Sequence, residues 1–108
     1  MTLEDRALVD SFLDMMAAEA GASRNTLLAY RTDLERSAES LKGVLGSADS
    51  EAISKLGGMW SDLAPSTVAR RSAALRRFYA FLIDDHVRTD DPSAALPRPG
   101  MARSLMAV

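Results

Sequence analysis

Four arginines lie within eight residues of one segment, at Arg70, Arg71, Arg76 and Arg77. A guanidinium group is a permanent cation whose planar donor fork matches phosphate oxygens or the edge of a guanine base. Ser66 and Thr67 precede the arginines at an expected helix start, where free backbone N–H groups favour a phosphate. The set predicts contact with a nucleic-acid backbone. The alternative is a solvated basic face with Ser66 as a plain helix cap.

A second segment offers side chains of the same kinds, at Arg24, Asn25, Thr26 and Arg31. Asparagine and threonine can read bases or hold phosphates. The alternative is local: Ser23 or Asn25 caps a helix, and Arg31 pairs with Glu35 one turn later. Two helix starts that carry arginine but no acid in one small chain favour the nucleic-acid interpretation.

The overall charge points the other way, because 15 acidic residues against 13 basic ones give a formal net charge of −2. The acids are segregated, however. None occurs between residues 20 and 32 or between residues 63 and 83, which are the two segments that hold the arginines described above. The position of the charges therefore argues for an anionic partner more strongly than their sum argues against one.

The chain has few residues of the types that bind metals or act as catalytic nucleophiles and bases. The chain has no cysteine and a single histidine, His86, which excludes thiolate metal sites and most catalytic triads. We expect no cofactor, no metal and no small-molecule substrate. No stretch approaches the ~20 apolar residues of a membrane span, and the acidic start differs from a signal peptide. A cytoplasmic protein without a membrane partner is expected.

The elements that position these side chains are predicted to be helices. Apolar residues recur at helical spacing over residues 3–20, 23–42, 50–60 and 65–84. One more helical turn is expected at residues 91–96, with Pro92 at its first position. No segment alternates with the period of a strand, so the fold class is all-α.

The helix over residues 65–84 should bury the stripe that contains Val68, Ser72, Leu75, Tyr79 and Leu82. A turn of ~100° per residue places Arg70 and Arg77 near the opposite face, with Ala73 and Ala74 between them. Arg71 and Arg76 should flank the buried stripe, one on each side.

Two blocks make the sequence similar to a known family. Residues 25–34 resemble the N-T-L-x-A-Y-x-x-D-L signature of Xer-type tyrosine recombinases, which belong with the phage integrases. Residues 66–82 resemble that family's S-T-x-x-R-x-L-S-A-L-R-x-F-Y-x-F-L helix, Phe12-Leu13 its opening, and Asp91-Pro92 its exit toward the catalytic domain. The resemblance covers about residues 8 to 100, in family order and at family spacing.

The resemblance implies a SAM-like, four-helix core-binding domain over residues 1–96 and a linker over residues 97–108. Such a domain forms one jaw of a clamp on recombination-site DNA, with its second and fourth helices facing the major groove. The implied partners are double-stranded DNA and other recombinase subunits, which assemble as a tetramer on DNA. Met15 and Met16 are then candidates for a subunit interface, although core methionines at helical spacing are the commoner case.

The resemblance also implies that the reaction belongs elsewhere. The family's nucleophilic tyrosine and its catalytic arginines lie in a C-terminal domain, so we expect no catalytic residue in this chain. Tyr30 and Tyr79 match core-binding positions, and His86 should be a surface or C-capping residue. Ser72 and Ser37 depart from the family, which usually has apolar residues there. At Ser72, either the helices pack closely or the fourth helix is rotated from the expected orientation.

Two other functions remain open on the sequence. A helical protein-interaction or oligomerisation module would fit the net negative charge and the methionine-bearing first helix, since SAM-like bundles also serve that role. A helix-turn-helix regulator fits less well, because the spacing from Gly43 to Pro65 offers no tight turn between two short helices.

Overall fold

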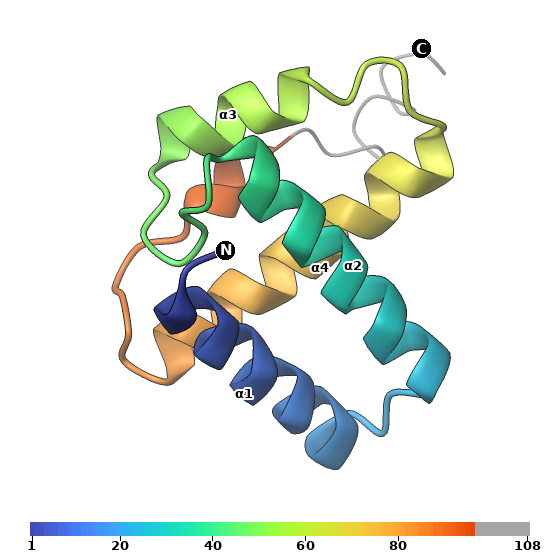
Figure 1. Cartoon of the computed structure of the whole chain (residues 1–108), viewed down its shortest axis with the longest axis vertical. Coiled ribbons are helices and arrows are strands. Elements are labelled where there is room, and N and C mark those ends of the chain that lie inside the picture. Colours follow the sequence, from blue (N-terminus) through green and yellow to red (C-terminus); the bar gives the residue numbers. More distant parts are fainter. Residues whose placement is uncertain (97–108) are drawn as a thin grey trace, which may run out of the picture.

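The computed structural model describes residues 1–96, which form four α-helices and a short 3₁₀ turn (Figure 1). The elements in chain order are α1 (Leu3–Glu19), α2 (Arg24–Ser40), α3 (Ser50–Gly58), α4 (Pro65–Asp84) and η1 (Pro92–Ala95). The all-α prediction is confirmed, and so are the four helices and the extra turn that begins with proline. No helix in the described part is long and apolar enough to cross a membrane. The proposed linker at residues 97–108 lies outside the described residues.

The first three helices begin at side-chain caps. In α1 the hydroxyl of Thr2 accepts a hydrogen bond from the backbone N–H of Asp5. In α2 the hydroxyl of Ser23 accepts one from the N–H of Thr26, and in α3 the carboxylate of Asp49 accepts one from the N–H of Ala52. Ser23 therefore caps α2, and Asn25 does not. The fourth helix begins differently: Ala64 occupies the cap position without a side-chain hydrogen bond, and Pro65 follows it. Ser66 is consequently not a cap.

Two helices end at residues with left-handed backbone where glycine is the usual choice. Lys42 after α2 and His86 after α4 both have φ of 60°. At the end of α4, the N–H of His86 donates a hydrogen bond to the carbonyl oxygen of Ile83. The N–H of Val87 donates one to the carbonyl oxygen of Leu82. His86 is exposed and lies in a Schellman-type C-cap, as expected for a surface or C-capping residue.

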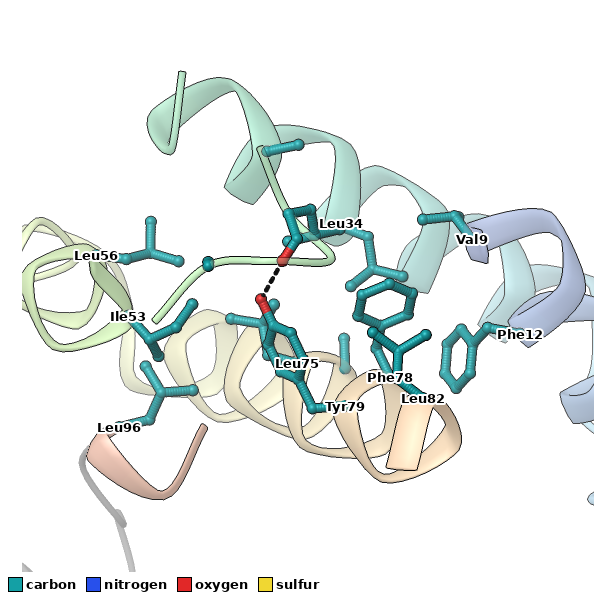
Figure 2. Packing of buried hydrophobic residues seen from close by; sticks show 14 of the residues in the cluster. Val9, Phe12, Leu34, Ile53, Leu56, Leu75, Phe78, Tyr79, Leu82 and Leu96 are labelled. Carbon is teal, nitrogen blue, oxygen red and sulfur yellow. Dashed lines mark hydrogen bonds between the residues drawn. The ribbon is translucent and has the colours of Figure 1, made fainter. Parts of the chain in front are cut away.

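Helices α2 and α4 cross near the middle of the molecule, with α1 below the crossing and α3 above it in Figure 1. Phe12 of α1 meets Phe78 of α4 edge-on, with ring centroids 5.7 Å apart. On the other side of α4, Ile53 and Leu56 of α3 face Leu96, which follows η1 (Figure 2). Helix α4 thus lies at the centre of the core.

This central position makes the buried arc of α4 wider than the single stripe predicted from periodicity. The arc consists of Ser72, Ala74, Leu75, Phe78, Tyr79 and Leu82. Placing Ala74 among the outward residues was wrong, because its side chain is fully buried. Ser72 is also fully buried, and its hydroxyl has no hydrogen-bond partner. The helix is therefore not rotated away from the core at Ser72.

Candidate nucleic-acid interface

A pair of hydrogen bonds joins Arg70 of α4 to Asp33 of α2, the two helices that carry the candidate arginines. The Nε and Nη2 atoms of Arg70 donate to the two carboxylate oxygens of Asp33 at 2.8 and 3.1 Å. The Asp33 side chain is 1% exposed, whereas that of Arg70 is 48% exposed. The guanidinium group thus spans from a buried carboxylate to solvent. The hydrogen bond and charge of Asp33 raise the pKa of Arg70.

A second arginine shares the same carboxylate. The Nε atom of Arg71 lies 3.6 Å from Oδ1 of Asp33, in an ion pair but without a hydrogen bond, and its side chain is 17% exposed. One buried negative charge therefore faces two positive ones, and the cluster keeps a net positive charge at the surface between α2 and α4.

The candidate residues of α2 differ in exposure: two are exposed and two are half-buried. Arg24 and Asn25 are open to solvent, and the hydroxyl of Thr26 lies 3.0 Å from that of Ser23. Arg31 does not pair with Glu35 one turn later. Its Nη2 atom instead reaches across to Asp10 of α1 at 2.8 Å, because α1 packs alongside α2. The local pairing proposed as an alternative was wrong.

The arginines farther along α4 face other neighbours. Nη2 of Arg76 lies 3.4 Å from the carbonyl oxygen of Leu96, next to η1. Arg77 is exposed and borders a groove between α1 and α4 that Met15 and Phe81 also line. The four arginines of α4 therefore do not share one face: the first two meet at Asp33, and the last two point to opposite flanks.

Ser66 and Thr67 lie in the first turn of α4, and Ser66 is exposed. The first turn holds no acidic side chain, and no side chain caps it. Pro65 has no N–H group and the N–H of Thr67 bonds the carbonyl oxygen of Ala64, so the N–H of Ser66 is the one in this turn that has no hydrogen bond among residues 1–96 and is open to an anion. In Figure 1 the amino-terminal ends of α2 and α4 both lie on the right of the molecule, on either side of the helix crossing. Both predicted segments thus begin on the same side of the molecule in this view.

Two carboxylates that pair with the candidate arginines, Asp33 and Asp10, were not among the residues predicted from the sequence. Asp33 lies three residues after Tyr30 and four before Ser37, on the stripe of α2 that packs inward. An acid on such a stripe needs a buried partner, and this was the available signal. No signal of this kind marks Asp10, which is exposed and far from Arg31 in sequence. Among residues 1–96, no three histidine or carboxylate side chains gather to hold a metal ion.

Residues 9–86 match the family model for the phage integrase N-terminal SAM-like domain. The chain is 60% identical over 99 residues to tyrosine recombinase XerC of Erythrobacter litoralis (strain HTCC2594), which covers 92% of the chain and 32% of that protein. It is 43% identical over 110 residues to tyrosine recombinase XerD of Brucella suis biovar 1 (strain 1330). That match covers 97% of the chain and 36% of the XerD protein.

A further relative is tyrosine recombinase XerD of Caulobacter vibrioides (strain ATCC 19089 / CIP 103742 / CB 15), which is 44% identical over 109 residues. That match covers 94% of the chain and 35% of the relative. The chain spans about a third of the length of these curated relatives. No solved structure gives a significant match.

Proposed function

Because the chain belongs to the phage integrase N-terminal SAM-like domain family, we propose that it binds double-stranded DNA as the core-binding half of a site-specific tyrosine recombinase. The surface formed by the amino-terminal halves of α2 and α4 is the proposed DNA-binding face. The observation that carries the proposal is Arg70, which a buried carboxylate holds at the surface with half of its side chain exposed. Arg24 and the uncapped first turn of α4, with Ser66 and Thr67, extend the same face.

The arginines do not contribute equally in this proposal. Arg70 and Arg71 supply the central cations, and Arg24 and Arg31 supply those on α2. Arg76, whose guanidinium group contacts the Leu96 carbonyl, and Arg77, on the flank toward α1, would meet phosphates at the edge of the face. Asn25 and Thr26 are the residues proposed to approach base edges, since asparagine pairs well with adenine in the major groove.

Fluorescence anisotropy with a duplex that carries a recombinase site tests this proposal. Arg24→Gln plus Arg77→Gln removes two exposed cations that have no ion pair among residues 1–96, so the fold should be unaffected. We expect weaker binding and a salt dependence that is shallower by about one unit per lost phosphate contact. Lys55→Gln plus Arg6→Gln, on the exposed surfaces of α3 and α1, is the control with the same charge change. An equal effect of both pairs would contradict the proposed face.

Strand cleavage is assigned to another part of the recombinase. Tyr79 is fully buried and donates a hydrogen bond to a backbone carbonyl, so it is not available as a nucleophile. Tyr30 is half-buried against the core, with its ring 6.4 Å from that of Phe12. The 108-residue chain should therefore bind a nicked suicide substrate without forming a covalent adduct, as judged by denaturing gel electrophoresis. A covalent adduct would contradict the assignment.

Other recombinase subunits are the second proposed class of partner. Met16 is 4% exposed and belongs to the core, whereas Met15 is only partly buried and borders the groove between α1 and α4. Met15 is thus the better candidate for a subunit contact. Light scattering on a duplex with two half-sites should show cooperative loading that Met15→Gln reduces. Cooperative loading that Met15→Gln does not change would contradict a subunit contact at Met15.

A further inference from the structure

Asp33 is a carboxylate in a place where an unpaired charge would be very costly. Its side chain is 1% exposed, at the crossing of α2 and α4. Transfer of an ionised carboxylate out of water is tolerated only when charged hydrogen bonds compensate it. Arg70 supplies that compensation through Nε and Nη2, the side-on edge of its guanidinium group.

This side-on arrangement leaves a defined set of donors. The N–H groups of Nη1 and the second N–H of Nη2 are not used by Asp33. They belong to a side chain that is 48% exposed, on the helix whose first turn is uncapped. The Asp33 contact thus fixes the plane and direction of the guanidinium group and turns the remaining edge toward solvent.

We propose that Asp33 is a positioning residue for DNA binding: it holds Arg70 in one orientation, so that the free edge of the guanidinium group contacts a phosphate of the DNA backbone. The inference rests on the proposed function. Arg71 supports it, because a second arginine 3.6 Å from the same carboxylate leaves the cluster positive and able to attract an anion.

The energetic gain comes from preorganisation. A free arginine loses rotamer freedom when it is fixed on a phosphate, and ordering one such side chain costs up to about tenfold in affinity. Arg70 has already lost much of that freedom in the unbound protein, because its two bonds to Asp33 join it to the core. A phosphate that meets this side chain therefore bears less of the ordering cost.

The proposal and simple charge counting predict opposite effects for Asp33→Asn. The substitution removes one negative charge, so charge counting alone predicts tighter binding to DNA. If Asp33 positions Arg70, the same substitution should weaken binding by about three- to tenfold and make the salt dependence shallower by up to about one unit. Asp62→Asn is the matched control, since it makes the same change at an exposed carboxylate outside the helices. It should not weaken binding.

The experiment measures anisotropy of the 108-residue chain on duplex DNA across a salt series, after circular dichroism has shown that each variant is folded. Arg70→Lys in the unaltered background is the second test, because lysine keeps the charge but cannot form the side-on pair with Asp33. We expect a loss similar to that of Asp33→Asn, and little further loss when the two substitutions are combined. If the Asp33→Asn variant does not fold, the DNA affinity of the Arg70→Lys variant tests the positioning role of Asp33.

The outcomes separate this inference from the proposed function. Wild-type binding together with equal or tighter binding by Asp33→Asn would overturn the positioning role alone. Arg70→Lys binding as tightly as wild type would do the same. Absence of salt-sensitive binding by the wild-type chain would overturn the proposed function and, with it, the role of Asp33.

Discussion

The hydroxyl of Tyr79 donates a 2.7 Å hydrogen bond to the carbonyl oxygen of Leu45, and both residues are fully buried (Figure 2). Leu45 lies in the loop between α2 and α3. The carboxylate of Asp5 accepts hydrogen bonds from the N–H groups of Leu45 and Gly46 at 2.7 and 2.9 Å. Side chains from α1 and α4 thus satisfy buried and partly buried backbone groups of an irregular segment.

Tyr79→Phe should lower the free energy of unfolding by about 1–3 kcal/mol, because the Leu45 carbonyl oxygen would lose its side-chain donor in a buried position. Urea denaturation followed by circular dichroism measures the change. Tyr30→Phe is the control: Tyr30 is only partly buried, and its hydroxyl has no hydrogen bond among residues 1–96. An equally large loss in Tyr30→Phe would show that the Leu45 contact is not the cause.

The same phenol predicts a pH dependence of stability. Burial raises the pKa of Tyr79 well above its ordinary value, although the nearby Arg88 guanidinium group opposes the shift. Above pH ~10 the unfolded chain loses the phenol proton while the folded chain keeps it. Stability from this group is therefore complete below pH ~10 and falls by about 1.4 kcal/mol per pH unit above it. The stability difference between wild type and Tyr79→Phe should shrink over that range; a constant difference would contradict the prediction.

Gly46→Ala should destabilise the protein by about 1–3 kcal/mol through overpacking. A Cβ atom at this position would lie 2.9 Å from Oδ1 of Asp5 and 2.9 Å from Cδ1 of Leu8. The carboxylate cannot move away without loosening its bonds to the loop. Gly58→Ala is the control, since nothing lies within 4 Å of its added Cβ. That variant should match wild type or gain up to about 1 kcal/mol in thermal unfolding.

Ser72→Ala should raise the free energy of unfolding by about 1 kcal/mol, because it removes a fully buried hydroxyl without a partner. Ser93→Ala makes the same chemical change at another fully buried serine, whose hydroxyl donates to Asp91. The second variant should lose stability. Chemical denaturation of both compares them directly, and a loss in Ser72→Ala would indicate an unrecognised partner for that hydroxyl.

The sequence predicted the features that depend on local signals. The Ser23 cap and the turn that opens at Pro92 were both identified, because capping and proline geometry act over a few residues. It could not predict which side chains meet across helices. Ala74 is buried because elements pack on more than one side of α4, and Arg31 pairs with Asp10 because α1 packs beside α2. Neither fact is encoded in the period of one helix.

In the proposed DNA-binding face, too, a local signal was predicted from the sequence and a contact between helices was not. Helical periodicity placed Arg70 on the outward face of its helix, and about half of its side chain is exposed in the structure. The ion pair between Arg70 and Asp33 joins residues 37 positions apart in sequence. No local sequence pattern could therefore indicate the orientation of the Arg70 guanidinium group.

The segment after α4 is joined to the rest of the fold by hydrogen bonds and by buried apolar surface. The family match ends at residue 86, yet Arg88 donates to the carbonyl oxygens of Gly46 and Ala48 at 2.9 and 3.0 Å, and Leu96 is 3% exposed against the core. A chain cut at the matched boundary would leave those carbonyls without donors and would expose the apolar side of α3. We therefore expect the unit that unfolds in a single step, and that resists limited proteolysis, to include the chain up to Leu96.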